Sequence, residues 1–577
     1  MNSRHIEHRV PAADANFSSV LHPLLQRIYA ARNVRSEAEL DQTLGTLHDF
    51  HGFHGMEQAV ALLAECLEHD RRILIVGDFD CDGATSSALA VRALRRLGAQ
   101  QVDYLVPNRF EYGYGLTPEI VALAAQRQPE LIITVDNGIS SLAGVAAARA
   151  AGIQVLVTDH HLPGAELPAA DAILNPNMPG DAFPSKSLAG VGVVFYLLLA
   201  LRAHLRAQGW FESRSIAEPN LAEYLDIVAL GTVADLVALD HNNRVLVAQG
   251  LSRLRAGRGI PGIFALLEAG KRDAALLTAA DLGFTVGPRL NAAGRLTDMS
   301  LGIECLLTDD PARARELAAR LDELNRERRD IEAQMQDDAL RILDGMGLHD
   351  DDPDLPFGLC LFDETWHQGV VGIVASRIKE RVHRPVIAFA RADDGSLKGS
   401  GRSVKGLHIR DALEAVSTRH PGLIEKFGGH AMAAGLSLGA DCFQRFAAAF
   451  DTEVRRLLSP EDMTGVIQTD GELEPEFLTL ECATMLRDAG PWGQGFPEPS
   501  FDGEFRLLER RLVGGAHLKL MLMQAATGQR LDAIAFRQTG EHLPADCERV
   551  RIVYRPDVNE FRGERRLQLL VEHIEPV

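Results

Sequence analysis

The chain has 577 residues, of which 46% are hydrophobic and 24% charged, and its formal net charge at pH 7 is −21. This length exceeds what a single hydrophobic core supports, so we expect about two to four globular domains. The sequence has no uninterrupted apolar run of the ~18 residues that a membrane helix needs, and its N-terminus lacks a signal-peptide core. The seven cysteines include no CxxC pair, which argues against a disulfide framework or zinc ribbon and favours a reduced, cytoplasmic protein.

The negative net charge does not exclude a nucleic-acid partner. Binding of a polyanion depends on where basic side chains cluster rather than on the total charge. Carboxylates gathered around divalent cations also add to the negative count, although the bound ions reverse the local field. The net charge therefore decides little about function.

Short apolar segments alternate with alanine-rich helical segments between residues 72 and 177. The apolar segments are "RILIVGDFD", "VDYLVPNR", "LIITVDNG", "VLVTDHH" and "AILNPN". Continuous apolar strands separated by helices predict a mainly parallel, doubly wound sheet. Because ligands of such sheets bind beyond the carboxyl ends of the strands, we expect acidic and histidine residues at these ends to meet.

A long amphipathic helix is predicted from Pro311 to Leu343, after helical patterns over residues 187–239 and 244–272. Its apolar positions recur at three- and four-residue steps. They are Leu317, Leu321, Leu324, Ile331 and Met335. The charged residues on its other faces could contact a polyanion, but a solvated surface is the simpler explanation.

The rest of the chain predicts two more domains, so the fold class is α/β multidomain. The segments "FGLCLFDE" and "RPVIAFAR" favour strands of a smaller α/β domain. From about Pro460, the short β-prone segments "HLKLMLM" and "RVRIVYRP" favour a small β-barrel.

The first predicted strand ends in three closely spaced aspartates, Asp78, Asp80 and Asp82, within "GDFDCDGA". Three carboxylates this close repel one another unless cations neutralise them. The alternative is a solvated acidic turn. The position directly after an apolar strand favours a metal site.

Other strand ends supply matching ligands: Asp136 follows the third strand, and Asp159, His160 and His161 follow the fourth. Asp235 lies in an apolar helical segment, where it either caps a helix or needs a charged partner. Oxygen-rich sites with one or two imidazoles favour Mn²⁺ or Mg²⁺ over zinc. A carboxylate that bridges two such ions, ~3.5–4 Å apart, is typical of phosphoester hydrolysis.

The motifs "DFDCDG", "TVDNG", "TDHH" and "GTVAD", in this order, resemble the four motifs of the DHH phosphoesterase superfamily. The segments "VPNRFEYGYGL", "LGFTVGPRLNAAGRL", "HQGVVGIVASR", "GSGRS" and "KFGGHAMAAGLSL" are similar to its single-strand-specific exonucleases, from about residue 45 onward. The resemblance implies five parts. They are an N-terminal extension (1–45), a parallel-sheet DHH catalytic domain (46–305), a connector helix (306–350), a DHHA1 domain that binds the 5′ end (351–458) and an OB-fold barrel (459–577).

The resemblance also implies a centre of two divalent ions, Mn²⁺ or Mg²⁺. Asp80 and Asp136 would hold one ion, and Asp82, Asp136, His160 and Asp235 the other. Asp136 would then bridge the two ions.

Two further residues of this centre, His161 and Asp159, would act beside Asp136 in catalysis. The resemblance places His161 near the scissile phosphate and Asp159 as a support for its histidine neighbours, whereas Asp226 is a weaker rival of Asp235 for the fourth motif. Many relatives carry a histidine where this chain has Val76. The first ion would then lack one usual ligand and be bound more weakly, be completed by water or Asp78, or be recruited only with substrate.

Substrate binding is predicted for basic and polar residues of several motifs. They are Arg109, Arg289, Asn291, Arg295, Ser400, Gly401, Arg402, Ser403 and His430. Arg109 has aromatic neighbours that suit base stacking, or that pack at a domain edge. "GSGRS" is either a structural turn or, as the resemblance implies, an anion nest for the 5′-terminal phosphate. Barrel candidates for binding the strand are Arg506, Arg510, Arg511, Lys519 and Arg555.

The resemblance implies a 5′→3′ exonuclease that hydrolyses single-stranded DNA to 5′-mononucleotides, in recombination and repair. Its partners would be single-stranded DNA with a 5′ end, a single-strand-binding protein and a helicase, and the chain would be a monomer. One alternative is a small-substrate enzyme of the superfamily, such as an oligoribonuclease or cyclic-dinucleotide phosphodiesterase. Another is a DNA-binding scaffold without catalysis.

Overall fold

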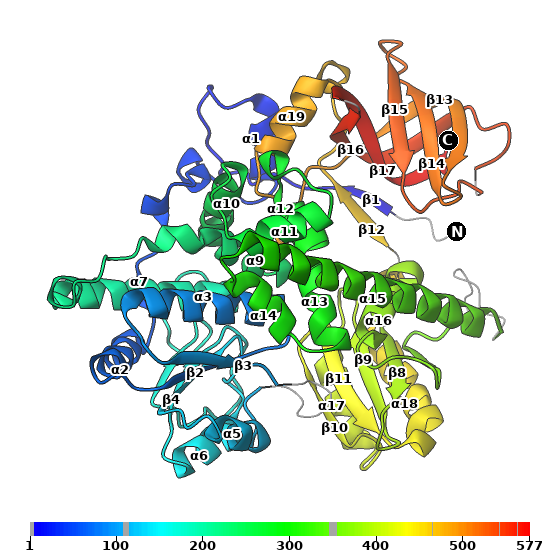
Figure 1. Ribbon diagram of the computed structural model, residues 1–577. Coiled ribbons are helices and arrows are strands. Elements are labelled where there is room, and N and C mark those ends of the chain that lie inside the picture. Colours follow the sequence, from blue (N-terminus) through cyan, green and yellow to red (C-terminus); the bar gives the residue numbers. More distant parts are fainter. Residues whose placement is uncertain (1–4, 108–114, 346–354, 464, 542, 562) are drawn as a thin grey trace. The chain divides into compact units, whose positions relative to one another are not determined.

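The computed structural model describes residues 5–107, 115–345, 355–463, 465–541, 543–561 and 563–577. They form two compact units, the larger comprising His8–Leu324 and Thr469–Val577 and the smaller comprising Met1–Glu7 and Asn325–Gln468. The predicted α/β multidomain class, with its parallel sheet, connector helix, second α/β sheet and terminal barrel, is confirmed (Figure 1).

A five-stranded parallel sheet lies in the larger unit, in the order β3–β2–β4–β5–β6. Each strand coincides with a predicted apolar segment. The strands are β2 (Ile73–Gly77), β3 (Val102–Leu105), β4 (Leu131–Val135), β5 (Gln154–Thr158) and β6 (Ala172–Leu174). Because the strands are parallel, the residues after β2, β4 and β5 emerge at one edge of the sheet.

Helices cover both faces of this sheet, with α2, α3 and α7 on one side and α5 and α6 on the other (Figure 1). The bounds are α2 (Met56–Glu68), α3 (Cys81–Leu97), α5 (Pro118–Ala125), α6 (Leu142–Ala150) and α7 (Gly190–Ala207). Helix α3 begins directly after β2, because the Asp80 side chain caps it by accepting a hydrogen bond from the amide of Gly83. Asp80 and Asp82 are thereby held at the strand end.

Helix α7 is the one helix of the described residues that is long and apolar enough to cross a membrane, although it contains Arg202 and Arg206. These arginines interrupt the apolar stretch, so the helix agrees with the expectation that no uninterrupted apolar run reaches ~18 residues. In addition, 67% of the helix is buried inside the protein, where it packs on α3 and α9. A core helix meets the same criteria.

More helices extend the larger unit between the sheet and the connector. They are α8 (Trp210–Ser213), α9 (Leu225–Ala234), α10 (His241–Arg255), α11 (Pro261–Ala269), α12 (Ala279–Asp281), a π-helical turn (Leu282–Val286), α13 (Gly287–Leu296) and α14 (Ser300–Leu307). The connector itself is α15 (Pro311–Gly345), a 35-residue helix that begins in the larger unit and ends in the smaller one. Four of its five predicted apolar positions are buried and Ile331 is half-buried, so the predicted amphipathic helix is confirmed.

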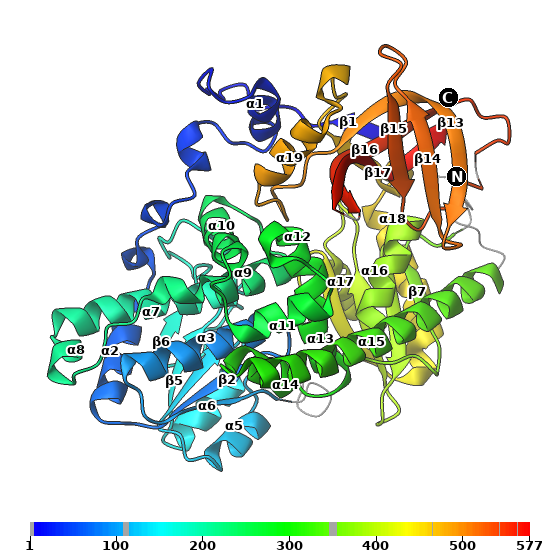
Figure 2. The same cartoon turned by 45° about the horizontal axis from the view of Figure 1, so that its top comes forward.

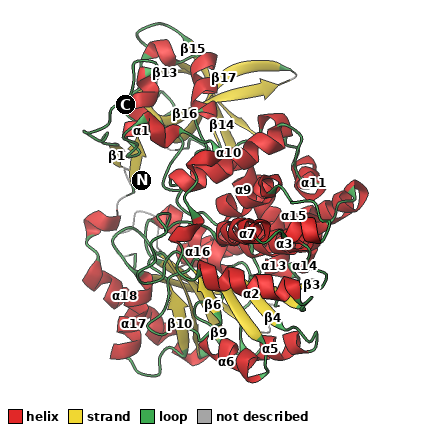
Figure 3. Cartoon of the chain, turned by 90° about the vertical axis from the view of Figure 1, so that its left-hand side faces the viewer, coloured by secondary structure: helices red, strands yellow, loops and turns green. Residues whose placement is uncertain are grey.

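The smaller unit is built on a mixed sheet in the order β10–β11–β9–β8–β7. Helices α17 and α18 pack on one face (Figure 3), and α16 packs on the other. The bounds are β7 (Leu359–Phe362), α16 (Val371–Val382), β8 (Val386–Arg391), β9 (Leu397–Arg402), α17 (Ile409–Arg419), β10 (Lys426–Gly429), β11 (Ala433–Leu438) and α18 (Phe443–Leu457).

The C-terminal strands close into the predicted small barrel, in the order β13–β14–β15–β17–β16 (Figure 2). The strands are β13 (Phe501–Val513), β14 (His517–Met523), β15 (Arg530–Ala535), β16 (Arg549–Phe561) and β17 (Glu564–Pro576). Helix α19 (Leu480–Asp488) precedes the barrel, and β12 (Val466–Thr469) pairs with β1 (His5–His8).

The N-terminal segment, including α1 (Pro23–Ala30), is attached to the chain just before the barrel. The Arg32 guanidinium forms a buried ion pair with Asp470 at 2.7 Å and donates to the carbonyl of Pro497 at 2.7 Å. The hydroxyl of Tyr29 donates to the carbonyl of Ala489 at 2.7 Å. The N-terminal segment therefore binds the residues between Asp470 and Pro497, which precede the barrel. The sequence did not predict this role.

Candidate metal centre

Seven acidic and imidazole side chains gather at the carboxyl edge of the parallel sheet. They form three groups, each with ligand atoms within 4.8 Å of one another, namely Asp78–Asp80–Asp136, Asp82–His160–Asp235 and Asp136–His160–His161. Because Asp136 and His160 each belong to two groups, the three groups form one cluster. The cluster includes every residue predicted to bind metal.

The centre of the cluster is His160, whose Nε2 atom lies 3.1 Å from Asp136 Oδ1 and 3.4 Å from Asp235 Oδ2. The Oδ2 atom of Asp235 is buried, yet it accepts no hydrogen bond within the described part of the chain. Carboxylates with an imidazole are the donor set that Mn²⁺ and Mg²⁺ favour. The residues present therefore fit the predicted divalent ions.

The N-terminus of α7 holds Asp82 in place. The backbone amides of Gly190 and Val191 donate to its two carboxylate oxygens at 2.6 and 3.0 Å. Burial and the neighbouring Asp80 nevertheless raise the pKa of Asp82 to about 7. Because the site concentrates negative charge, bound cations would stabilise it.

Burial, followed by repulsion from neighbouring carboxylates, also raises the pKa of Asp136 and of Asp235 well above the usual range for aspartate. Three carboxyl groups of the cluster thus share this perturbation. Such shifts are characteristic of functional sites.

The backbone of Asp136 adopts a left-handed conformation, with φ of 61°, which is uncommon for a residue other than glycine. Next to it, the buried Asn137 amide donates to the carbonyls of Val76 and Val135 at 3.1 and 2.9 Å. Asn137 thus joins the ends of β2 and β4, which carry the acidic residues. The prediction missed this role, although "TVDNG" places the asparagine directly after the metal-binding aspartate.

Val76 is fully buried in the apolar cluster between the sheet and helices α5 and α6. The valine side chain supplies no ligand atom. Asp78, however, lies within ligand distance of Asp80 and Asp136, as one of the three groups shows. Asp78 therefore lies where the first predicted ion could gain a further oxygen ligand.

Asp159 accepts hydrogen bonds from the backbone amides of His160 and His161 at 2.7 and 3.0 Å, and its Oδ1 atom lies 2.7 Å from His161 Nδ1. Its other oxygen accepts from the amide of Ile139 at 2.9 Å. Burial alone would raise the pKa of Asp159, but these hydrogen bonds lower it. Burial likewise opposes protonation of His161, but Asp159 raises the histidine pKa. Asp159 therefore holds the backbone of the turn at His160 and His161 and the orientation of the His161 imidazole.

Asp226 lies apart from the three groups. Its oxygens accept from the backbone amides of Ile227 and Ile260 at 2.9 and 2.7 Å. It belongs to none of the acidic groups found in the described part of the chain. The geometry thus favours Asp235 for the fourth motif.

In the larger unit, the predicted substrate-binding residues Arg289 and Asn291 make internal contacts. Arg289 is buried and forms an ion pair with Asp322 of α15 at 2.8 Å. Asn291 accepts a hydrogen bond from the backbone amide of Cys81 at 2.7 Å. Their proposed DNA contacts stay predictions, as does that of the half-buried Arg295. Arg109 and its aromatic neighbours Phe110, Tyr112 and Tyr114 lie outside the described residues.

In the smaller unit, the Arg402 guanidinium donates to Ser400 Oγ at 3.0 Å and to the carbonyl of Gly401 at 2.8 Å. A Cβ at Gly372 would lie 2.9 Å from both Arg402 Nη2 and Ser400 Oγ, so the first turn of α16 abuts this pair. Burial lowers the pKa of Arg402. A half-buried cation beside a hydroxyl and a helix N-terminus is an arrangement suited to an anion.

The remaining residues predicted near this anion site differ in setting. Ser403 is buried, its hydroxyl donates to the carbonyl of Leu407 at 2.8 Å, and its amide donates to that of Met432 at 2.9 Å. His430 is exposed in the turn between β10 and β11. Ser403 therefore shapes the loop, whereas His430 is accessible.

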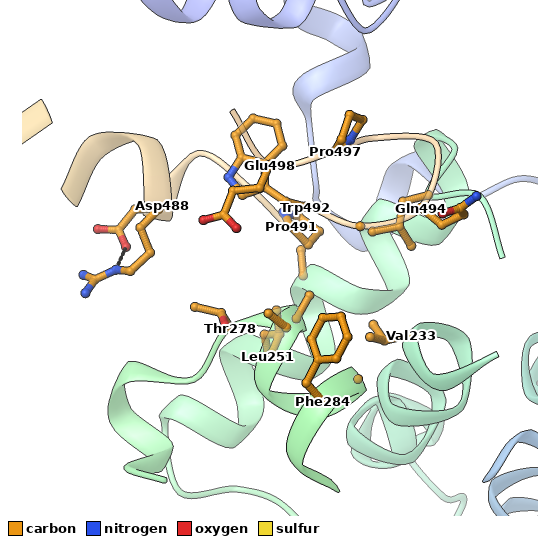
Figure 4. Close-up of a pocket in the computed structure, with 18 of the residues that line it drawn as sticks. Val233, Leu251, Thr278, Phe284, Asp488, Pro491, Trp492, Gln494, Pro497 and Glu498 are labelled. Carbon is orange, nitrogen blue, oxygen red and sulfur yellow. Dashed lines mark hydrogen bonds and ion pairs between the residues drawn. The ribbon is translucent and has the colours of Figure 1, made fainter. Parts of the chain in front are cut away.

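A separate cavity of 580 Å³ lies elsewhere in the larger unit, between helices α9, α10 and α12 and the loop 487–498. Phe284 and Trp492 line opposite sides of it (Figure 4). Its lining, as far as the chain is described, includes none of the seven acidic and imidazole side chains. The cavity is therefore distinct from the metal centre.

Comparison with known proteins identifies three domains in this chain. Residues 72–232 match the DHH family N-terminal domain, residues 356–456 the DHHA1 domain and residues 469–573 the RecJ OB domain. Two curated relatives, both named single-stranded-DNA-specific exonuclease RecJ, come from Dickeya dadantii and Escherichia coli. The first is 59% identical over 99% of both chains, and the second 57% identical over 98% of this chain and 97% of its own.

A solved structure agrees with the same relationship. The crystal structure of RecJ from Thermus thermophilus in complex with Mn²⁺ is 30% identical and superposes with a TM-score of 0.81. The match covers 100% of this chain and 80% of that one. The chain therefore belongs to the RecJ family of single-stranded-DNA-specific exonucleases.

Proposed function

We propose that this protein is a metal-dependent exonuclease that degrades single-stranded DNA in the 5′→3′ direction to 5′-mononucleotides. The observation that carries the proposal is the continuous cluster around Asp136 and His160, in a chain whose relatives are named single-stranded-DNA-specific exonucleases. A scaffold without catalysis is disfavoured because the cluster includes every predicted ligand. The terminal barrel disfavours a small-substrate enzyme.

The ligands divide between two ions, Mn²⁺ or Mg²⁺, with Asp136 shared. Asp80 and Asp136 hold one ion, and Asp82, Asp136, His160 and Asp235 hold the other. When bound, the ions supply an activated water and neutralise charge on the phosphate.

Two residues next to the ligands assist the reaction. His161 contacts the scissile phosphate, and Asp159 keeps its ring in place through the bond to Nδ1. Because Asp159 raises the pKa of His161, the imidazole is more readily cationic beside a phosphate anion.

The direction of digestion follows from capture of the 5′-terminal phosphate in the smaller unit. Ser400, Gly401 and Arg402 bind this phosphate, with Ser403 shaping the loop and His430 assisting. Arg109, Arg289, Asn291 and Arg295 are the predicted contacts to the strand in the DHH domain. Barrel arginines such as Arg510 and Arg511 extend the path along the DNA backbone.

The wider biological setting is part of the same proposal. We infer a monomer that acts in the cytoplasm in recombination and repair, together with a helicase and a single-strand-binding protein. The proposed parts are the extension 1–45, the DHH domain 46–305, the connector 306–350, the DHHA1 domain 351–458 and the OB-fold 459–577.

The test is a product analysis on 5′-phosphorylated single-stranded DNA labelled at either end, with Mn²⁺, Mg²⁺ or chelator. The wild-type protein should release labelled mononucleotides from the 5′ end only when a divalent ion is present. Asp136→Ala should abolish cleavage with either ion while single-strand binding survives. Turnover by Asp136→Ala would contradict the shared-ligand role, and release from the 3′ end would contradict the direction.

A further inference from the structure

Helix α13 contacts the turn that carries the first acidic residues. Asn291 Oδ1 accepts a hydrogen bond from the backbone amide of Cys81 at 2.7 Å. Cys81 lies between Asp80 and Asp82, and it is the first residue of α3. Its amide is one of the donors that a helix start leaves without an intrahelical partner. Asn291 satisfies this donor from another helix.

The contact is reinforced one turn later in α13, at Gly294. A Cβ at this position would overlap the carbonyl oxygen of Phe79, which precedes Asp80. Gly294 and Asn291 are three residues apart, so they lie on the same face of the helix. The face of α13 formed by these two residues therefore lies directly against the acidic turn.

The start of α13 is anchored to the connector helix. Arg289 is buried and forms an ion pair with Asp322 of α15 at 2.8 Å, and its guanidinium also donates to the carbonyl of Thr285 at 2.6 Å. The guanidinium of Arg289 thus binds partners inside the protein. Helix α13 is thus fixed to α15 at Arg289 and to the acidic turn at Asn291.

We propose that Asn291 is a positioning residue for the metal centre, which holds the Asp80–Asp82 turn from outside, and that Arg289 anchors the helix that presents it. This inference rests on the proposed function. It differs from the prediction that Asn291 and Arg289 contact the DNA strand, and the experiments below distinguish the two roles. Groups that orient metal ligands typically change metal affinity by about 10–100-fold when they are removed.

The experiment measures Mn²⁺ binding to the DNA-free protein by calorimetry. Asn291→Ala removes the acceptor, so Mn²⁺ should bind about tenfold more weakly. Asn291→Asp keeps an acceptor oxygen but adds a negative charge beside Asp80 and Asp82, so it should bind Mn²⁺ at least as tightly as the wild type. Asn16→Ala makes the same substitution at an exposed asparagine and should change nothing. Thermal unfolding without metal verifies that each variant is folded, and Asn291→Leu, which has a similar size and no acceptor, replaces any Asn291→Ala protein that is not.

Steady-state kinetics separates positioning from DNA contact. With Asn291→Ala, kcat should fall at low Mn²⁺ and recover as Mn²⁺ is raised, while KM for 5′-phosphorylated single-stranded DNA stays at the wild-type value. If Asn291→Ala had wild-type Mn²⁺ affinity together with a raised KM, the inference would be overturned and a contact between Asn291 and DNA would be supported. A wild-type protein that binds no Mn²⁺ would overturn the proposed function as well, so the two failures are distinguishable.

Discussion

The backbone amide of Gly190 donates a hydrogen bond to Asp82 Oδ2 at 2.6 Å, so the first residue of α7 contacts a predicted metal ligand directly. A Cβ at Gly190 would lie 2.8 Å from Asp136 Cβ and 2.9 Å from Asp82 Oδ2. Because both distances are shorter than side chains tolerate, only glycine allows this approach. The first residue of α7 therefore packs directly against both Asp82 and Asp136.

Gly190→Ala should therefore separate Asp82 from Asp136 and weaken the metal centre. We expect Mn²⁺ affinity and kcat to fall at least about tenfold, as for other losses of ligand orientation. Calorimetry and single-strand degradation at low Mn²⁺ measure the two effects. Gly45→Ala is the matched control, because a Cβ at Gly45 would meet no atom within 4 Å. Equal Mn²⁺ affinities for the two variants would contradict this packing argument.

The metal-free protein should lose stability as pH rises. An aspartate titrates near 3.9 in the unfolded chain, whereas the folded Asp82 has a pKa of about 7. Between about pH 4 and pH 7 the folded state thus binds more protons, so the free energy of unfolding falls as pH increases. Bound cations replace these protons, so Mn²⁺ should raise the Tm more at pH 8 than at pH 5.5.

Thermal unfolding with chelator or Mn²⁺ at the two pH values measures this effect. Asp82→Asn removes the titrating group and supplies the comparison, because other residues also contribute to the pH dependence. For Asp82→Asn, the rise in Tm caused by Mn²⁺ should differ less between pH 8 and pH 5.5 than it does for the wild type. An unchanged difference would mean that Asp82 does not cause the loss of stability.

The ion pair between Arg32 and Asp470 should stabilise the larger unit. Both side chains are 1% exposed, and a second hydrogen bond joins them at 3.0 Å. Arg32→Met would leave the buried Asp470 carboxylate with two weaker partners, Arg9 at 3.2 Å and the Ser500 amide at 3.1 Å, so we expect a loss of about 3 kcal/mol. Urea unfolding gives this value. Arg35→Met removes an exposed partner of Asp14 and should cost less than about 1 kcal/mol.

Arg402→Ala should reduce the preference for a 5′-phosphate end over a 5′-hydroxyl end. The lost charge-assisted hydrogen bonds are worth about 1.5–3 kcal/mol, which corresponds to about tenfold or more in the ratio of kcat/KM values. Competition between the two substrates measures the ratio. Arg391→Ala, at an exposed arginine paired with Glu364, is the control in the same unit. A preserved preference in Arg402→Ala would contradict 5′-end capture.

The strand ends that carry the metal ligands were predictable from local pattern. The segments before Asp78, Asp136 and Asp159 are continuous apolar runs, and parallel strands bring their carboxyl ends to one edge. Helix α15 was equally visible, because Leu317 and Leu321 keep helical spacing over a long stretch. In both cases the information lies in consecutive residues.

The contacts of Asn291 and Arg289 were not predictable in this way, because their partners lie far along the chain. An asparagine and an arginine in a glycine-rich motif fit a DNA site as well as an interior contact, and the sequence shows neither the hydrogen bond to Cys81 nor the ion pair with Asp322. The N-terminal segment was missed because it contains short turns without periodicity. Its main partner, Asp470, is separated from Arg32 by 438 positions.

That separation sets an order of events during protein synthesis. At roughly 5–20 residues per second, a ribosome needs roughly 20–90 s to make the chain between Arg32 and Asp470. Throughout this interval the arginine lacks its Asp470 counter-ion, whereas Asn325–Gln468, which supplies most of the smaller unit, is complete before Asp470 is made. The larger unit is thus completed last, around a domain inserted in its middle. A nascent chain that stops before residue 469 would expose its N-terminal segment to proteases.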